Sequence, residues 1–316
     1  MRFKRTPLPG EFSARTQRFD VPPIRAQLVH RPRGVGAMTH DAVFAPIVGM
    51  SGDEIPFTRL VHMEKDAHDC KYHLYPSPWL SGAAEAGLPS PLSILGDVTT
   101  GAAARHGRPD HQRVVTEALR VDVLRPHADD LVMSAHQTWS DDRRAIAQGT
   151  IEDAASGVAV AHVVARIVLL DARRPGSKVV APNELRVEHA RPPDVRDLLA
   201  EQPAHTGGPG HGFSWLVGTT GALGNSYGFM HGGAIAALCD IGLDRLRRIP
   251  DEGLVGAVVQ SVTLDFFAPV LLTGTAHLTA QLVHNGGNRA EVVIGIGNDD
   301  SEVGAVACYR LRQVSS

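Results

Sequence analysis

Hydrophobic positions along the chain follow two spacings, one typical of helices and one typical of strands. Apolar residues three and four positions apart predict helices over 88–104 and 231–248. Alternation of apolar and polar residues predicts four strands after each helix. These strands are expected over 112–124, 130–139, 144–152 and 157–170, and over 256–267, 275–284, 289–298 and 303–311. Each helix is therefore followed by a four-stranded antiparallel meander.

Shorter segments and changes in composition divide the chain further. Strands are also predicted before the helices, over 55–63, 70–75 and 184–189. The first fifty residues are rich in Pro, Arg and Gly without sustained periodicity, so 1–50 is interpreted as an N-terminal extension. An Arg-, Pro- and Gly-containing segment, 173–182, is interpreted as a linker. It separates two predicted units, 51–172 and 183–316.

The two units keep the same separations between distinctive residues, which indicates an internal repeat. The interval from Asp97 to Pro126, the proline that closes the next strand, equals the interval from Asp240 to Pro269. The offset between the halves is thus 143. It grows to 145 where Arg144–Ala145 meets Arg289–Ala290, and to 146 where Val160–Ala161 meets Val306–Ala307. Short insertions in hairpin turns produce such drift.

The second helix is apolar on nearly every side over 234–243. Such a helix must be covered on most of its surface. A curved antiparallel sheet folded around a long helix meets that requirement. The predicted fold class is therefore α+β, with two copies of this unit in one chain.

Composition and charge narrow the classes of function. The 316 residues are 43% hydrophobic, and 31 basic against 34 acidic side chains leave a formal charge of −3. This balance provides no overall attraction for nucleic acid or an anionic membrane. Three scattered cysteines form no disulfide framework, and neither a signal peptide nor a membrane-spanning run is recognised. We therefore expect a cytoplasmic protein without nucleic-acid or membrane partners.

One motif carries a specific resemblance. Asn225, Gly228, His231, Gly232 and Gly233 form the pattern N-x-x-G-x-x-H-G-G, and Asp240 follows nine residues after the histidine. This pattern resembles the signature of PaaI-like acyl-CoA thioesterases, which have the hotdog fold. The resemblance covers 183–316 directly and 55–170 through the repeat. It implies a tandem double hotdog that hydrolyses acyl-CoA or another acyl thioester, with Gly228 and Gly233 in substrate binding and no cofactor. A homo-oligomer of such chains is a further expectation.

The residue types in the motif suit thioester hydrolysis. Gly232 and Gly233 leave backbone N–H groups open at a helix N-terminus, where the dipole favours a developing oxyanion. Asp97 and Asp240 each interrupt an apolar helix. A buried carboxylate is costly unless it has a role, and a partly dry carboxylate suits a general base.

The resemblance implies a composite site, because hotdog units pair and each site takes the Asn and His-Gly-Gly turn from one unit and the Asp with a Ser or Thr from the other. In the first half, Leu88-Pro89-Ser90 replaces the turn, but Asp97 and, nineteen residues later, Thr116 remain. In the second half, Val259 stands nineteen residues after Asp240. The predicted catalytic set is therefore Asp97, Thr116, Asn225, His231 and Gly232, and Asp240 marks an inactive pseudo-site. Asp240 also lies more than two helical turns beyond Gly232, too far to serve the same carbonyl.

Two alternatives stay open at this point. Gly224-Asn225-Ser226-Tyr227-Gly228 also matches G-x-S-x-G, the nucleophile elbow of serine hydrolases, with Ser226 as the nucleophile. That motif requires a strand directly before Ser226 and alternating strands and helices. A non-catalytic protein that binds acyl-CoA is the other alternative, although binding alone needs no base. The remaining histidines show no metal-ligand spacing, so no metal is expected.

Overall fold

The computed structural model describes residues 56–66, 70–80, 82–109, 111–128, 130–171, 212–225, 227–249, 252–272, 274–298 and 303–313. All of these residues lie in the compact unit Thr39–Ser316. Of the predicted segments, the extension 1–50, the linker 173–182 and the strand 184–189 fall outside the described residues. Within the described ranges, no helix is long and apolar enough to cross a membrane.

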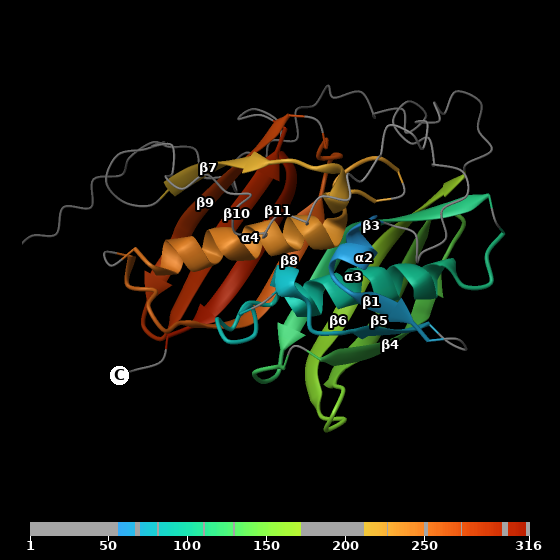
Figure 1. Ribbon diagram of the computed structural model, residues 1–316, viewed down its shortest axis with the longest axis horizontal. Helices are drawn as coiled ribbons and strands as arrows, with labels where there is room; N and C mark the ends of the chain where they lie inside the picture. The colour runs from blue at the N-terminus through green and yellow to red at the C-terminus, as the bar shows by residue number, and fades with distance from the viewer. Residues whose placement is uncertain are drawn as a thin grey trace, which may run out of the picture. The chain divides into compact units, whose positions relative to one another are not determined.

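The described strands form one antiparallel sheet of eleven strands (Figure 1). Their order across the sheet is β1-β2-β4-β5-β6-β3-β8-β11-β10-β9-β7. The strands of the first half are β1 (Met63–Lys65), β2 (Lys71–Leu74), β3 (Gln112–Val123), β4 (Leu131–Ser140), β5 (Arg144–Asp153) and β6 (Ala159–Asp171). Those of the second half are β7 (Gly212–Gly218), β8 (Val258–Phe266), β9 (Thr275–Gly286), β10 (Arg289–Gly297) and β11 (Val303–Arg312). All eight predicted strands are confirmed, but the predicted four-stranded meanders are wrong: β4, β5 and β6 pair in chain order, as do β9, β10 and β11, whereas β3 pairs with β6 and β8 pairs with β11. Alternation of apolar and polar residues indicates which face of a strand is buried and not which strand lies next to it.

Two long helices, α3 (Ser90–Arg105) and α4 (Gly232–Arg247), confirm the helical predictions. They contact each other, and α3 packs on β3 to β6 while α4 packs on β9 to β11 (Figure 1). Almost every residue of α4 is buried, as its apolar surface requires. The predicted α+β architecture, with a long helix followed by four strands in each half of the chain, is confirmed.

The junction between the halves is the ladder of β3 with β8. Ala118–Asp122 pair with Ser261–Asp265, and the central pair is Arg120 with Thr263, whose numbers differ by the repeat offset of 143. Both strands also carry a β-bulge at matching positions. Glu117 is the extra residue in β3, and Gln260, which is related to it by the same offset, is the extra residue in β8. The repeat offset read from the sequence is therefore the offset that relates the two central strands.

The register of the last strand corrects one detail of the repeat. Leu119 pairs with Ala165, and its counterpart Val262 pairs with Tyr309. The offset between β6 and β11 is thus 144 rather than the predicted 146. Because the two values differ by two residues, both place the same face of the strand toward the core.

Two other local predictions need correction. The segment 55–63, predicted as a strand, forms instead the short helix α2 (Pro56–Leu60) followed by β1. Phe57 in this helix is fully buried, so packing against the rest of the core rather than strand pairing determines its conformation. Strand β7, which pairs with β9 at the edge of the sheet, lies in a region interpreted from the sequence only as Gly-rich. The other short strand prediction, 70–75, is confirmed by β2.

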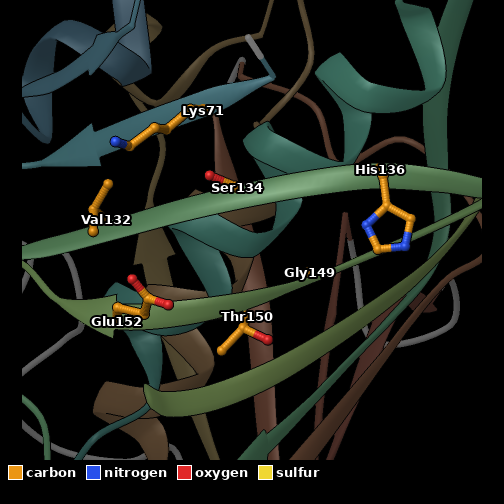
Figure 2. Close-up of a pocket in the computed structure, with 7 residues that line it drawn as sticks. All are labelled: Lys71, Val132, Ser134, His136, Gly149, Thr150 and Glu152. Atoms are coloured by element: carbon orange, nitrogen blue, oxygen red, sulfur yellow. The ribbon is translucent and has the colours of Figure 1, made fainter. Parts of the chain in front are cut away.

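A polar cavity of about 260 Å³ lies on the outer face of the first half's sheet (Figure 2). Alternate residues of β4, Val132, Ser134 and His136, face this cavity, while Leu131 and Met133 are buried on the other face. The complete lining is Lys71, Val132, Ser134, His136, Gly149, Thr150 and Glu152. This cavity is therefore on the opposite side of the sheet from the helices.

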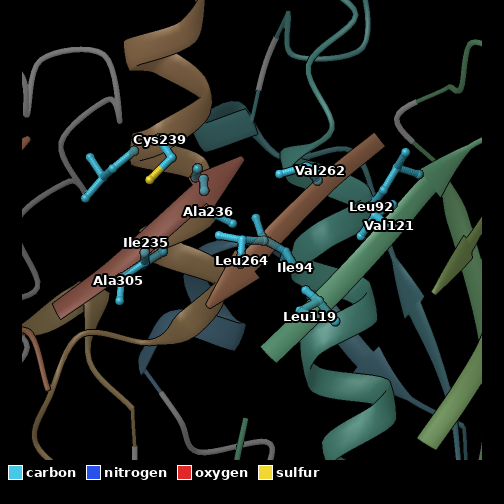
Figure 3. Packing of buried hydrophobic residues seen from close by; sticks show 14 of the residues in the cluster. Leu92, Ile94, Leu119, Val121, Ile235, Ala236, Cys239, Val262, Leu264 and Ala305 are labelled. Carbon is cyan, nitrogen blue, oxygen red and sulfur yellow. The ribbon is translucent and has the colours of Figure 1, made fainter. Parts of the chain in front are cut away.

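The hydrophobic core runs without a break from one half to the other (Figure 3). Leu92 and Ile94 of α3, Leu119 of β3 and Leu264 of β8 belong to one cluster, together with Ile235 of α4. All five side chains are at most 3% exposed. This shared core holds the first turn of α4 against the first two turns of α3.

Candidate active site

The Asp97 carboxyl lies in the second turn of α3 and is only 7% exposed. Thr116 donates a hydrogen bond from Oγ1 to Asp97 Oδ1 over 2.6 Å. Thr116 directly precedes the bulged residue Glu117, and a bulge re-aims the neighbouring side chains of a strand. One carboxylate oxygen is thus held by Thr116, while the other, Oδ2, faces the second half of the chain.

Gly232 from the second half meets that oxygen at the start of α4. A Cβ atom placed on Gly232 would lie 2.8 Å from Asp97 Oδ2 and 3.3 Å from Phe266 Cζ. Only glycine leaves this space open. The Gly232 N–H makes no hydrogen bond to any described residue, as expected for a first-turn amide. A carboxylate and an open backbone donor therefore border the same small space.

His231 precedes this amide and caps the helix. Its Nδ1 accepts a hydrogen bond from Gly233 N–H over 3.0 Å and lies 3.4 Å from Asp97 Oδ2. Because Nδ1 accepts a proton donor, the neutral ring carries its own hydrogen on Nε2. Burial lowers the pKa of His231, although the Asp97 charge opposes that shift. Hence His231 is neutral here, and its contact with Asp97 is not a full ion pair.

An aromatic ring from α2 supports the histidine. Phe57 stacks on the His231 ring with a centroid distance of 4.8 Å and packs edge-on against Trp79 of the 3-10 helix η2 (Pro78–Leu80). A Cβ on Gly233 would lie 2.9 Å from Phe57 Cε1, so the second glycine of the pair is required for this packing. The sequence offered no signal for Phe57 because its segment was predicted as a strand.

Asn225 and Gly228 shape the turn that leads into α4. Asn225 Oδ1 accepts hydrogen bonds from the N–H groups of Tyr227 and Phe229, and Gly228 adopts a φ of 83°, which favours glycine. Only the Nδ2 amide of Asn225 is left as a donor to a ligand. Tyr227 donates from its hydroxyl to the carbonyl of Val114 in β3 over 3.2 Å, and burial raises its pKa to about 12. This bond ties the turn to the strand that carries Thr116.

Asp240 occupies a different environment, although it is the counterpart of Asp97. It is 1% exposed, and Tyr309 of β11 donates a hydrogen bond to its Oδ1 over 2.6 Å. Burial raises the pKa of Asp240 to about 7, while Tyr309 and Ser90 at the start of α3 oppose the shift. Asp240 therefore lies beside the N-terminus of α3 and not beside the N-terminus of α4. The Gly232 amide is remote from Asp240.

The start of α3 lacks the features found at the start of α4. Pro89 is the N-cap residue of α3, it makes no side-chain capping bond, and it has no N–H to donate. The predicted residues thus fall into two groups: Asp97 and Thr116 meet His231 and Gly232, whereas Asp240 faces Ser90. Tyr309 and Arg247, which border Asp240, were not singled out in the sequence, because only the folded chain brings them to the carboxyl.

The nucleophile-elbow interpretation does not fit this fold. Every strand pairing described is antiparallel, whereas that motif belongs to alternating strand-helix units. Helix α4 begins at Gly232, several residues after the motif serine. Ser226 itself lies outside the described residues. Among the described residues, no group of three or more His, Cys, Asp or Glu is placed to hold a metal ion.

Fold and site together define the chain as a double-hotdog protein. Residues 227–305, which span the turn, α4 and most of the following strands, match the model of the thioesterase superfamily. That match includes His231, Gly232 and Asp240 but not Asp97 or Thr116. No curated protein sequence matches the chain significantly.

Solved structures agree with the double-hotdog architecture. The chain is similar to a tesB protein of Mycobacterium avium subsp. paratuberculosis, with a TM-score of 0.59, 10% identity and coverage of 82% of this chain and 98% of that one. It is also similar to the acyl-CoA thioesterase II TesB2 of Mycobacterium marinum, with a TM-score of 0.55, 12% identity and the same coverage. A hot dog fold protein of unknown function from Alicyclobacillus acidocaldarius gives a TM-score of 0.53 and 14% identity over the same shares. At these identities the likeness concerns the fold.

Proposed function

We propose that this protein hydrolyses acyl-CoA thioesters at the composite site formed by Asp97 and Thr116 with Asn225, His231 and Gly232. The observation that carries the proposal is the position of the Asp97 carboxylate, bonded by Thr116, against the open amide of Gly232. The match of 227–305 to the thioesterase superfamily and the PaaI-like motif in the same region support the choice of reaction.

In this proposal each group has one task. The thioester carbonyl oxygen accepts a hydrogen bond from Gly232 N–H, where the α4 dipole favours negative charge. Thr116 holds Asp97 Oδ1, so Oδ2 is the oxygen that takes a proton from the attacking water. Neutral His231 keeps the Gly232-Gly233 turn in place through its bond from Gly233 N–H. The Nδ2 amide of Asn225 is the second donor available to the carbonyl.

The bond changes follow from this arrangement. Water oxygen bonds to the carbonyl carbon while Asp97 accepts its proton, and the resulting oxyanion rests on the Gly232 amide. Collapse of this intermediate breaks the C–S bond and expels the thiolate. The proton held by Asp97 then leaves with the thiol, which yields a carboxylic acid and a free thiol and restores the carboxylate.

The carrier of the acyl group is proposed to be coenzyme A. Arg105, at the end of α3, and Arg113, at the start of β3, lie close enough to Tyr227 to lower its pKa against the effect of burial. Arg105 Nη1 already donates to the Arg108 carbonyl over 2.6 Å, so what the two guanidinium groups offer to a phosphate-bearing carrier is positive charge beside the turn. The three cysteines are not paired in disulfides, in keeping with the expected cytoplasmic location. Association of such chains into a homo-oligomer stays a prediction.

The test is a hydrolysis assay over a panel of acyl-CoA substrates, with detection of free thiol. We expect thiol release by the wild-type protein and a loss of about 10²-fold or more in the Asp97→Asn variant. Binding of acyl-CoA without thiol release over the whole panel would instead identify a non-catalytic acyl-CoA-binding protein.

A further inference from the structure

The second carboxyl of the repeat, Asp240, stands where a second site would be expected. Asp97 faces the start of α4 at Gly232, and Asp240 correspondingly lies by Ser90 at the start of α3. The two arrangements differ in what surrounds the carboxyl. Asp97 is bonded by Thr116, whereas Asp240 is bonded by Tyr309, whose register counterpart in β6 is Ala165.

Arg247 is the other large side chain near Asp240. It follows Asp240 by seven residues, so both residues lie on the same face of α4, two turns apart. Arg247 is only 8% exposed, and its Nη1 donates to the carbonyl of Ala86 over 3.1 Å. Ala86 belongs to the turn that precedes α3. The guanidinium thus spans from the end of α4 to the entrance of α3.

The rest of this guanidinium is not satisfied by the protein. Neither Nε nor Nη2 of Arg247 has a hydrogen-bond partner among the described residues. Unpaired buried donors are costly, so an arginine kept for a structural ion pair would use most of its N–H donors in hydrogen bonds. At offset 143 the first half carries Ala104, which contributes a single methyl group at the corresponding place.

We propose that Arg247 closes the second site, so that each chain retains one site for an acyl thioester. The part concerning the thioester rests on the proposed function. Buried Arg247 lies near enough to the pseudo-site carboxyl for its charge to act on Asp240, Tyr309 donates to Asp240 Oδ1, and Pro89 has no amide to match the one that Gly232 supplies in the other half. The inactivity of this site is therefore a matter of occupied space as well as of missing chemical groups.

The first test shortens Arg247 to alanine and adds a small guanidinium compound that can take the place of the deleted atoms. Ethylguanidinium corresponds to the atoms deleted in the Arg247→Ala variant, and binding to a specific cavity raises the melting temperature saturably. We expect this rise in Arg247→Ala, and a smaller rise with ethylammonium, which fills less of the deleted volume. The neighbouring Arg248→Ala is the matched control, since Arg248 is exposed and pairs with Asp244 over 2.7 Å. No response in Arg247→Ala, or an equal response in Arg248→Ala, overturns the proposal.

A third variant decides the question if Arg247→Ala does not fold. Arg247→Leu keeps most of the volume without the charge, so a residue that acts by filling space predicts melting within a few degrees of wild type. A Leu variant that is as defective as the Ala variant would show that the guanidinium itself is needed and would overturn the proposal.

The second test counts sites on the wild-type protein by calorimetric titration with a non-hydrolysable thioether analogue of acyl-CoA. We expect one equivalent bound per chain. Two equivalents would show that the second site is open and would overturn the proposal. No binding at all would refute the proposed function instead, and the ethylguanidinium experiment, which needs no thioester, would still decide the role of Arg247.

Discussion

Replacement of Asp240 by Asn tests whether the second carboxyl is a structural group rather than a base. Asn keeps the shape of the side chain and can still accept the hydrogen bond from Tyr309. It removes the ability to ionise and replaces one acceptor oxygen by an amide donor, and this second difference does not depend on pH. Since Asp240 is 1% exposed and its pKa is about 7, the folded protein resists ionisation of this carboxyl far more than the unfolded chain does.

The size of the effect follows from proton linkage. An unfolded Asp has a pKa of about 3.9, so the folded value of about 7 lies roughly three pH units higher. Below about pH 4 the carboxyl is protonated in both states, and the wild type has no disadvantage from this group. As the pH rises to about 7, the unfolded chain releases the proton and the folded chain does not. At about 1.4 kcal/mol per unit, the wild type loses about 4 kcal/mol relative to Asp240→Asn.

The measurement is urea unfolding of both proteins from about pH 4 to about pH 8. The difference in the free energy of unfolding should change steeply up to about pH 7 and level off above it. The Arg247 charge is present in both proteins, so it does not contribute to this slope. In Tyr309→Phe, loss of the donor raises the pKa of Asp240 further, and the slope should extend above pH 7. The reasoning would be refuted if the difference in the free energy of unfolding between Asp240→Asn and the wild type did not change with pH, or if it changed in favour of the wild type as the pH rises.

Turnover provides the remaining predictions. Asp240→Asn should keep most of the wild-type kcat. Asp97→Asn should lower kcat about 10²-fold or more, with little change in the dissociation constant of a non-hydrolysable analogue. Equal losses of kcat and of affinity would indicate a structural Asp97. Gly232→Ala places a methyl group 2.8 Å from Asp97 Oδ2 and should lower kcat at least about tenfold. Gly232→Pro deletes the N–H and should lower kcat about 10²-fold or more. Gly101→Ala in α3 is the matched control, because nothing lies within 4 Å of its added Cβ, and an unchanged kcat is expected. Thr116→Val should reduce kcat in steady-state thiol assays, and a wild-type rate in that variant would contradict its role on the water-activating carboxylate.

Periodicity along the chain was sufficient to predict the two long helices, the four strands that follow each helix and the repeat that relates the halves. It did not predict that β3 pairs with β6 and β8 with β11 instead of with the next strand along the chain. The offset of 143 is also the separation of Arg120 and Thr263, the central pair between the halves, and of the bulged residues Glu117 and Gln260. Such features follow from local pattern, because each strand or helix must turn one apolar face toward a core. Under the resemblance to PaaI-like thioesterases, the complementary losses in the two halves, Pro89 in one and Val259 in the other, also indicated which turn and which carboxyl to consider together.

The partners of the buried polar groups could not be predicted in this way. Tyr309 is 69 residues from Asp240, Ala86 is 161 residues from Arg247, and Phe57 belongs to a short apolar segment that is compatible with either a strand or a helix. A hydrogen bond or a ring contact depends on where two distant backbones bring their side chains, and periodicity within either segment contains no such information. The sequence therefore predicts which carboxyl keeps a threonine and which faces a turn without an amide. The packed tertiary structure alone shows that a tyrosine donates a hydrogen bond to the second carboxyl and that a buried arginine lies near it.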